Sequence, residues 1–264
     1  MSEPSAQPAS PSTSDPDDWE THWGKYAGAA EHNPAQSFRR RVILGLLTLR
    51  DPPHRYLDIG SGQGDLALAV SERWPNAEIA GIDLSTEGVE ISARKLAKGR
   101  FQQADVLGGE GPAEDMAGWA THATCSEVLE HVDQPEAFIR SAARWLAPGA
   151  VLAVTTPGGE RSAFDVHIGH RRHYTASELA AVIEAAGFSV VDSGGAGFPF
   201  FNLYRRVVIA RGDKLVDDFE EPDSVSLAAR VALGAFDVLL RVSATRGRRG
   251  LQTYVLATAP VNPQ

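Results

Sequence analysis

The sequence predicts an α/β fold in which helices cover both faces of a doubly wound, mostly parallel sheet. From residue 55 onward, short apolar runs of strand length alternate with amphipathic segments of helix length, which is the pattern of repeated strand–helix–strand units. The chain has 264 residues, and 43% of them are hydrophobic, which is enough for one large core. We therefore expect one main domain.

The chain ahead of this alternation divides into two parts. Residues 1–18 are rich in Ser, Pro, Ala and Asp and hold no large apolar side chain, so we expect a disordered tail. Residues 19–54 are expected to form an N-terminal helical cap, which Pro52 and Pro53 bring to an end. Its aromatic and helically spaced apolar residues are Trp19, Trp23, Tyr26, Phe38, Val42, Leu46 and Leu49.

The part of the chain in which strands and helices alternate, residues 55–193 and 251–260, is expected to be the core of the domain. The spacing of the apolar residues and the length of each segment distinguish its strands from its helices. The expected strands are residues 56–59, 77–83, 101–105, 120–126, 149–157, 188–192 and 251–259. The expected helices are 65–74, 86–98, a helix after Pro135, and 176–186.

Residues 194–250 interrupt the alternation just before the last strand. Two stretches, FPFFNLYRRVVIA and SVSLAARVALGAFDVLLRV, have apolar residues at helical spacing, so we expect a helical insertion. Long insertions usually carry a function, and this one is expected to be a lid over a substrate pocket, with a dimer surface as the alternative. The glycines expected as hinges are Gly194, Gly195 and Gly197. The residues expected nearest the substrate are Phe198, Phe201 and Tyr204.

The first strand ends in an acid that is followed by three glycines. Asp58 precedes Gly60, Gly62 and Gly64, which allow a ligand to approach the backbone closely before the next helix begins. A dinucleotide fingerprint is spaced G-x-G-x-x-G, whereas this loop is spaced G-x-G-x-G. An acid here would repel a pyrophosphate, yet it suits a cofactor that carries an ammonium group and a sulfonium.

Two more acids end the neighbouring strands. Asp83 follows the second strand, about where an acid accepts hydrogen bonds from two ribose hydroxyls. Asp105 follows the third strand, beside the expected position of an adenine. Three acids at three consecutive strand ends therefore predict a nucleoside-containing cofactor along one edge of the sheet.

The segments LDIGSGQGDLALAV, GIDLS, QADV and SEVLEHV, in this order and spacing, resemble the class I S-adenosylmethionine-dependent methyltransferases. The resemblance covers about residues 36–192. It implies a Rossmann-like sheet of seven strands whose last strand is antiparallel, and S-adenosylmethionine as the cofactor. It also implies that the cofactor-binding residues are Asp58, Gly60 and Gly62 at the methionine portion, Asp83 at the ribose, and Asp105 and Val106 at the adenine, together with Leu84 and Ser126.

The segment SEVLEHV also carries two acids and a histidine. Glu127, Glu130 and His131 are spaced i, i+3 and i+4, so one helical turn would put their heads on one side. Their E-x-x-E-H arrangement is similar to that of ubiquinone-type O-methyltransferases and of small-RNA 2′-O-methyltransferases, where it binds a divalent cation. In other methyltransferases the same residues serve as structural partners or as a polar wall, and this alternative stays open.

A second histidine-rich stretch runs from His167 to His173. In the RNA enzymes a further histidine lies five residues before a threonine that starts the next helix, and His170 stands in that relation to Thr175. The resemblance thus implies a metal site of Glu127, Glu130, His131 and His170, which would hold Mg²⁺ or Mn²⁺. His173 lies at the entry of a helix that Thr175 is expected to cap.

Methyl transfer requires a nucleophile in line with the departing sulfur and a route for its proton. His131 or His170 is the expected catalytic base, or a cation lowers the pKa of the hydroxyl. We expect a hydroxyl of a small-molecule acceptor from secondary or quinone-like metabolism. The alternatives are an RNA 2′-O-methyltransferase and a non-catalytic cofactor-binding protein; the glycine spacing disfavours a nicotinamide oxidoreductase.

Charge and composition limit the remaining choices. The net charge of −9 argues against a nucleic-acid partner, because such binding depends on neutralising phosphates. We expect no membrane span, because no apolar run approaches about 18 residues.

The start of the chain lacks a basic segment followed by an apolar one, so we expect a cytoplasmic protein. Its single cysteine, Cys125, is expected to be an inert core residue. A homodimer is the partner expected beside the acceptor.

Overall fold

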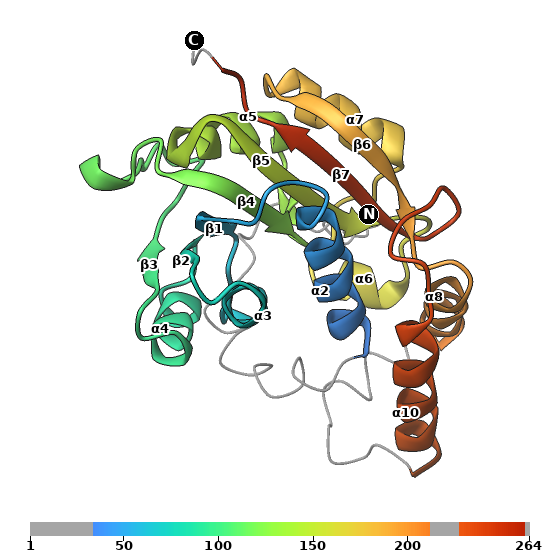
Figure 1. The fold of residues 1–264 in the computed structure, drawn as a ribbon. Helices are drawn as coiled ribbons and strands as arrows, with labels where there is room; N and C mark the ends of the chain where they lie inside the picture. The colour runs from blue at the N-terminus through green and yellow to red at the C-terminus, as the bar shows by residue number, and fades with distance from the viewer. Residues whose placement is uncertain (1–33, 212–226, 262–264) are drawn as a thin grey trace, which may run out of the picture.

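The computed structural model describes residues 34–211 and 227–261 (Figure 1). Within them, seven strands form one sheet in the order β3-β2-β1-β4-β5-β7-β6. Strands β1 to β5 pair in parallel, and β7 runs antiparallel between β5 and β6. The expected Rossmann-like sheet with an antiparallel last strand is confirmed. The expected tail and the residues Trp19, Trp23 and Tyr26 lie outside the described residues.

The elements follow one another along the chain as the alternation predicts. The strands are β1 (Arg55–Ile59), β2 (Glu78–Asp83), β3 (Arg100–Gln103), β4 (Ala120–Ser126), β5 (Leu146–Pro157), β6 (Ser189–Ala196) and β7 (Gln252–Thr258). The α-helices are α2 (Pro34–Leu47), α3 (Asp65–Arg73), α4 (Thr86–Lys95), α5 (Pro135–Ala142), α6 (Ala163–His167), α7 (Ala176–Ala185), α8 (Phe200–Arg211) and α10 (Leu227–Arg241). Short 3₁₀ turns lie at η1 (Glu114–Met116), η2 (Leu129–His131) and η3 (Ala143–Trp145).

Side-chain caps explain why several helices begin where they do. The Ser85 hydroxyl accepts a hydrogen bond from the Gly88 N–H at the start of α4. Thr175 and Glu178 form a capping box at the start of α7, as the sequence predicts. Ser162 and Asp165 form a second capping box on the short helix α6. Asp165 is buried there, so this cap fixes a charged group inside the protein.

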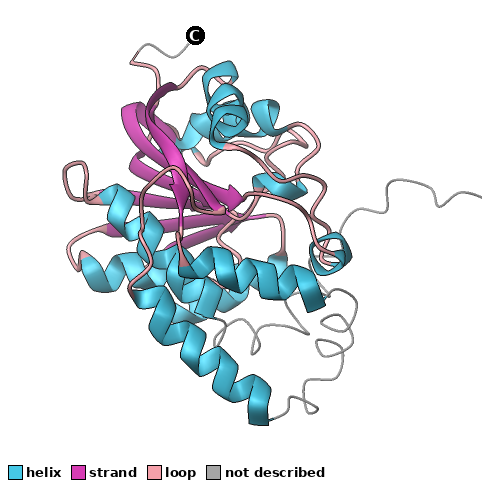
Figure 2. Cartoon of the chain, turned by 90° about the vertical axis from the view of Figure 1, so that its right-hand side faces the viewer, coloured by secondary structure: helices cyan, strands magenta, loops and turns pink. Residues whose placement is uncertain are grey.

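Helices cover both faces of the sheet, and Figure 2 shows the two layers. On one face, buried residues of α5 and α7 pack on the central strands around Trp145. On the other face, α2 and α3 pack with α8 and α10, and Phe38 of α2 stacks on Phe201 of α8 with ring centroids 4.9 Å apart. The free cysteine Cys125 lies fully buried in strand β4, as expected.

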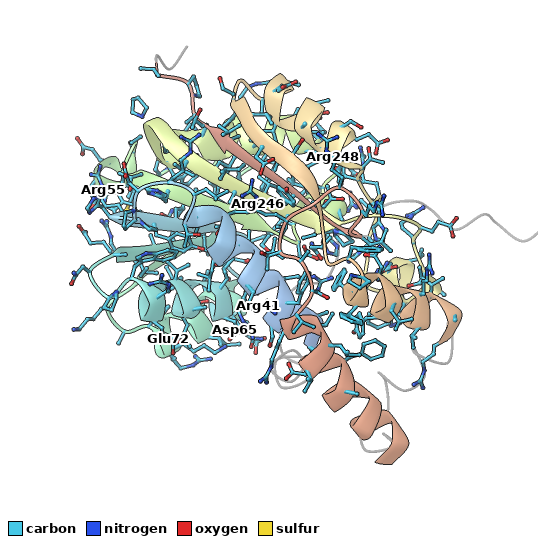
Figure 3. All side chains as sticks on the ribbon, turned by 45° about the vertical axis from the view of Figure 1, so that its right-hand side comes forward. Arg41, Arg55, Asp65, Glu72, Arg246 and Arg248 are labelled. Atoms are coloured by element: carbon cyan, nitrogen blue, oxygen red, sulfur yellow. The ribbon has the colours of Figure 1, made fainter. Side chains whose placement is uncertain are left out.

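Helix α10 is tied to the body through α2. The Arg41 guanidinium of α2 donates hydrogen bonds to the carbonyl oxygens of Leu240 and Arg241, at 2.8 and 2.7 Å. Figure 3 shows Arg41 between these helices. A cation at the last carbonyls also complements the negative end of the helix dipole. No helix of the described residues is long and apolar enough to span a membrane.

The insertion begins later than the sequence suggests. Strand β6 continues past the expected boundary at 193 as far as Ala196, and Gly194 and Gly195 pair with β7. These two glycines are therefore sheet residues, and the expectation that they act as hinges is wrong. A Cβ on Gly195 would lie 2.2 Å from the Gly250 carbonyl oxygen, so close backbone packing requires glycine there.

The order of the strands places the site. The chain runs outward in one direction through β1, β2 and β3 and in the other through β4 and β5, so the connections diverge between β1 and β4. Ligands of open α/β sheets bind beyond the carboxyl ends of the strands at such a point. The loop after β1 and the turn η2 after β4 both lie there.

Candidate functional site

The loop after β1 is a backbone cradle. Gly60, Gly62 and Gly64 have φ angles of 73°, 49° and 79°, which L side chains rarely adopt. A Cβ on Gly60 would also lie 2.3 Å from a methyl carbon of Val128, in the loop after β4. The loop can thus pass close to that neighbouring loop only because Gly60 lacks a side chain.

Asp83 joins this loop to the end of β2. One carboxylate oxygen accepts a hydrogen bond from the Gly62 N–H at 2.7 Å, and the other accepts from the Ser85 N–H at 2.9 Å. Both carboxylate oxygens are therefore hydrogen-bond acceptors at the edge of the glycine loop. Asp83 lies at the strand end where the sequence places it, and it also fixes the glycine loop, a role that the sequence did not reveal.

Asp58 is almost completely buried at the end of β1. Its carboxylate accepts a hydrogen bond from the Thr124 hydroxyl at 2.8 Å, and that hydroxyl lies 2.5 Å from the Tyr56 hydroxyl. Because the single proton of the Thr124 hydroxyl is donated to Asp58, the Tyr56 hydroxyl is the donor in its hydrogen bond with Thr124. Burial raises the pKa of Asp58 to about 7, an effect that Thr124 opposes and the nearby Asp83 reinforces.

The other expected cofactor residues lie around the same edge. Asp105 accepts a hydrogen bond from the Gly108 N–H at 2.7 Å, and Val106 beside it is buried. Leu84 is exposed next to Asp83, which leaves it open to a ligand. The Ser126 hydroxyl lies 2.9 Å from the Thr155 hydroxyl where β4 ends.

Glu127 does not join the other members of the expected metal site. Its φ is 58°, so no helical turn runs through it, and the 3₁₀ turn η2 begins only at Leu129. The expectation that one turn aligns the three heads is therefore wrong. The Glu127 carboxylate lies 2.8 Å from the Arg39 guanidinium and accepts a hydrogen bond from Gln252 at 2.7 Å. These contacts occupy it in a network that joins α2 to β7.

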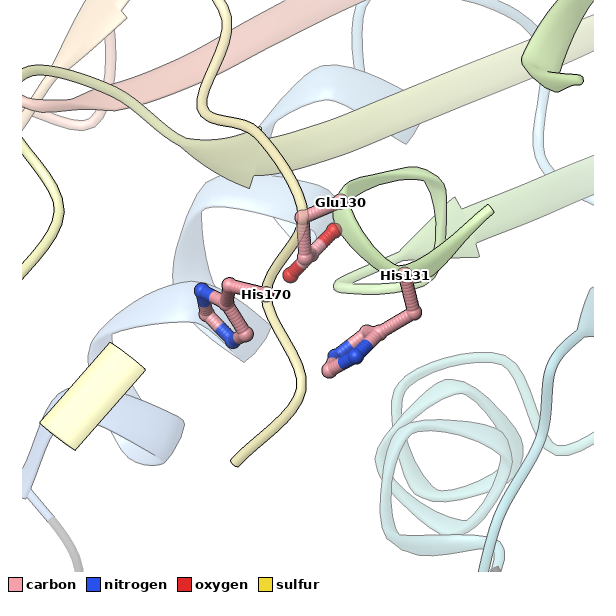
Figure 4. Close-up of side chains that lie close together, drawn as sticks. All are labelled: Glu130, His131 and His170. Carbon is pink, nitrogen blue, oxygen red and sulfur yellow. The ribbon is translucent and has the colours of Figure 1, made fainter. Parts of the chain in front are cut away.

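The structure brings the other three together. One ligand atom each from Glu130, His131 and His170 lies within 4.8 Å of the other two, and we call these residues the Glu130 cluster. Figure 4 shows the carboxylate of Glu130 directed toward the two imidazole rings. The rings meet edge to face, with centroids 4.7 Å apart. Side chains from η2 and from the loop after α6 thus form one polar cluster.

Glu130 is fully buried, and neither carboxylate oxygen has a hydrogen-bond partner among the described residues. Burial, reinforced by the charge of Glu127, raises the pKa of Glu130 well above its ordinary value. Burial also lowers the pKa of His170 to about 2, and the neighbouring His131 adds to this shift. The protein by itself therefore disfavours a charge on either Glu130 or His170.

A second group of potential ligands, Asp165, His170 and His173, lies beside the cluster. The Asp165 carboxylate is already engaged: it receives hydrogen bonds of 3.0 and 2.8 Å from Arg205 and of 2.7 Å from the Ser162 backbone. Burial alone would raise the pKa of Asp165, but Arg205 and Ser162 hold it below its ordinary value. This group is a structural ion pair rather than a binding site.

Sequence reasoning missed Asp165, Arg205 and Arg39. The spacing Ser162-x-x-Asp165 was a visible capping signal. Arg205 lies 40 positions along the chain from Asp165, in another helix, and nothing local indicates their contact. Phe201, expected near the acceptor, is 1% exposed and belongs to the core against Phe38.

A protein-family model described as a methyltransferase domain matches residues 30–193 of this chain. The matched segment contains the glycine loop, Asp83 and the Glu130 turn. The chain belongs to the methyltransferase-domain family. By this family and its fold it is a class I S-adenosylmethionine-dependent methyltransferase.

Curated relatives of this methyltransferase carry the name ubiquinone biosynthesis O-methyltransferase. The one from Psychrobacter arcticus is 37% identical over 109 residues, which are 39% of this chain and 40% of the relative. The one from Aeromonas salmonicida is 28% identical over 168 residues, 57% of this chain and 70% of the relative. The one from Xanthomonas axonopodis pv. citri is 31% identical over 157 residues, which are 53% of this chain and 65% of the relative. The match to the Psychrobacter relative thus spans less than half of its length.

Solved structures show the fold shared by this methyltransferase. The [4+2]-cyclase SpnF has a TM-score of 0.56 at 21% identity and covers 84% of this chain and 82% of its own. A phosphoethanolamine N-methyltransferase from Haemonchus contortus, solved with S-adenosyl-L-methionine, has a TM-score of 0.54 at 16% identity. The match covers 82% of this chain and 52% of the N-methyltransferase. A cyclase and an N-methyltransferase share this fold, so the reaction must be argued from the site.

Proposed function

We propose that this methyltransferase transfers a methyl group from S-adenosylmethionine to a hydroxyl of a small molecule whose oxygens bind a divalent cation at the Glu130 cluster. The single observation that carries the proposal is the Glu130 carboxylate, fully buried and without a hydrogen-bond partner among the described residues, beside two imidazoles. A charged carboxylate is costly there, so the free protein holds a neutral acid, and a bound cation would stabilise the charged form. The names of the relatives also indicate transfer to oxygen.

The proposed cofactor contacts follow from the groups that face the glycine loop. Asp58 and the cradle of Gly60 and Gly62 hold the methionine portion, because a buried carboxylate suits an ammonium group. Asp83 binds the ribose hydroxyls through its carboxylate, which ends β2 beside the glycine loop. Leu84 packs on the nucleoside, and Asp105 and Val106 border the adenine. Ser126 contributes from the end of β4.

The proposed cation fits the donors that are present. One carboxylate and two imidazole nitrogens suit a first-row transition ion such as Mn²⁺ better than Mg²⁺, which prefers oxygen ligands and would need water to complete its shell. Glu130, His131 and His170 would hold the ion, and Glu127 stays with Arg39. When bound, the ion lowers the pKa of an acceptor hydroxyl and holds two neighbouring oxygens.

Residues of the protein orient His131 and position the acceptor. The His131 Nδ1 lies 3.2 Å from the Gly169 carbonyl oxygen, which can only accept, so Nδ1 carries a proton and this contact orients the ring. Helix α8 lies beside the cluster, because its Arg205 binds Asp165 of α6, and we propose that the insertion lines the acceptor pocket. Methyl transfer itself needs in-line alignment of oxygen, methyl carbon and sulfur, which such positioning supplies.

Transfer of labelled methyl from S-adenosylmethionine to catechol tests the function, because catechol presents two adjacent hydroxyl oxygens. We expect turnover that a chelator abolishes and Mn²⁺ or Mg²⁺ restores. Glu130→Gln should lower turnover by about 10²–10⁴-fold, the range for loss of assisted deprotonation. Cofactor affinity measured by calorimetry should stay unchanged.

Glu184→Gln, on the exposed side of α7, is the matched control and should retain full activity. Turnover that survives both chelation and Glu130→Gln would contradict the cation and leave His131 as the base. Methylation of an RNA 3′ end in place of catechol would contradict the small-molecule acceptor.

A further inference from the structure

The histidines beside the Glu130 cluster form a chain of hydrogen bonds that ends on the backbone. The His173 Nδ1 lies 3.1 Å from the Gly159 carbonyl oxygen, and the His173 Nε2 lies 3.0 Å from the His170 Nδ1. The His170 and His173 rings lie with their centroids 5.3 Å apart. His173 belongs neither to the cofactor cradle nor to the proposed cation ligands.

The direction of this chain follows from its last member. A carbonyl oxygen only accepts, so the proton of His173 must be on Nδ1. With Nδ1 donating to Gly159, a neutral His173 ring leaves its Nε2 without a proton. That nitrogen is then an acceptor, and the His170 Nδ1 must donate to it. Since His170 is neutral as well, its Nε2 carries a bare lone pair.

The charged neighbours agree with this direction. Asp165 lies 3.8 Å from the His170 Nδ1 and is held in place by Arg205 and Ser162. A carboxylate on that side favours the proton on Nδ1. The opposite tautomer would turn two lone pairs toward each other across 3.0 Å at the His170–His173 contact.

We propose that His173 is a positioning residue that fixes His170 in the tautomer whose Nε2 lone pair faces the Glu130 cluster. The proposal rests on the proposed function for what that lone pair binds, while the tautomer itself is a property of the protein alone. Partners that orient a liganding histidine in this way typically change metal affinity by about 10–100-fold when they are removed.

Two substitutions separate this role from simple packing. His173→Phe keeps the ring and removes the acceptor, whereas His173→Gln loses the ring and keeps an oxygen acceptor near the position of Nε2. A tautomer-setting role predicts that glutamine is tolerated and phenylalanine is not, and a packing role predicts the reverse. His167→Gln, at an exposed histidine three positions before His170, is the matched control.

The first measurement is the ¹⁵N spectrum of histidine-labelled full-length protein without metal, with His170 assigned from a His170→Gln sample. We expect an unprotonated Nε2 on His170 in the wild type, in His173→Gln and in His167→Gln, and a mixture of tautomers in His173→Phe. A protonated Nε2 in the wild type would overturn the proposal, even if His173→Phe failed to fold. An unchanged spectrum in folded His173→Phe would overturn it too.

The second measurement is Mn²⁺ binding by calorimetry on the same samples. Affinity should fall about 10–100-fold in His173→Phe and stay within about threefold of the wild type in His173→Gln. Should no sample bind Mn²⁺ while the spectra come out as expected, the cation of the proposed function fails and the tautomer assignment stands. Equal affinities in the wild type and His173→Phe would overturn the positioning role.

Discussion

The cofactor edge and the Glu130 cluster lie at the same end of the sheet and are built in opposite ways. At the cofactor edge the charged groups already have partners in the protein, as Asp83 does in the N–H groups of Gly62 and Ser85. At the cluster a buried carboxylate lacks any hydrogen-bond partner among the described residues. The first region is organised before a ligand arrives. The second holds a buried acid whose raised pKa keeps it neutral unless a positive charge lies beside it.

Three predictions test whether the two regions are separate. Each substitution should change one of them and leave the other as it is.

Arg205→Met should have the largest effect, and it should fall on the cluster side. It removes the partner of a buried carboxylate and leaves Asp165 uncompensated, which costs about 3–5 kcal/mol of unfolding free energy. Urea denaturation measures this loss. Because the pKa of Asp165 is held below its unfolded value, the pair stabilises the protein above about pH 4, and this stability is lost as the pH falls.

Arg206→Met is the control, since Arg206 is the exposed neighbour on the same helix. In folded Arg205→Met protein, cofactor affinity should match the wild type while Mn²⁺ affinity falls. Cofactor and Mn²⁺ binding weakened to the same extent would mean that the two regions are one unit.

Asp58→Asn should act on the cofactor side, with an expected loss of about 1.5–3 kcal/mol of binding free energy, about 10–100-fold in affinity. Wild-type affinity should rise with pH through about 7, because only the ionised carboxyl pairs with an ammonium group. Calorimetry between pH 6 and 8 measures both effects. The raised pKa also means that Asp58 favours folding of the free protein below about pH 4, an advantage lost as the pH rises to about 7.

The asparagine variant should show no such rise in affinity, and Asp51→Asn, at an exposed aspartate, should behave as the wild type does. An asparagine variant with wild-type affinity at pH 8 would remove Asp58 from the cofactor site.

Thr124→Val should have the smallest effect, about 1 kcal/mol in cofactor binding. The Thr124 hydroxyl donates to the Asp58 carboxylate and lowers its pKa, so its loss should move the midpoint of the pH dependence upward. Titrations from pH 6 to 9 give the midpoint. A midpoint that stays in place would show that Thr124 does not control the charge of Asp58.

How far the sequence predicted each region depends on how local its contacts are. The glycine loop and Asp58 lie within seven consecutive positions, so their spacing alone predicted the cradle. Asp83 could be placed because a parallel strand ends at a fixed edge of the sheet. The sequence pattern does not show contacts between residues far apart in the chain. Phe201 was expected near the acceptor from its helical spacing, yet it stacks on Phe38 in the core.

The metal site stays a prediction, and the residues proposed for it are the farthest apart in the sequence. Glu130, His131 and His170 do lie together, although the reasoning that joined Glu127 to them assumed a helical turn. The positive φ of Glu127 breaks that turn and directs its carboxylate to Arg39. Sequence spacing cannot show such a local change of backbone conformation, and Asp165 and Arg205 meet only because α8 folds back over α6.

The two ends of the insertion meet each other. Gly195 of β6 accepts a hydrogen bond from the Gly250 N–H at 3.0 Å, and the Gly195 N–H donates to the Gly247 carbonyl oxygen at 2.8 Å. A segment that leaves and re-enters at touching backbone positions forms a closed loop, and doubling the length of a flexible loop costs only about 0.6 kcal/mol in closure entropy. The segment between β6 and β7 can therefore lengthen, shorten or change its sequence during evolution while the sheet and its glycine loop stay the same.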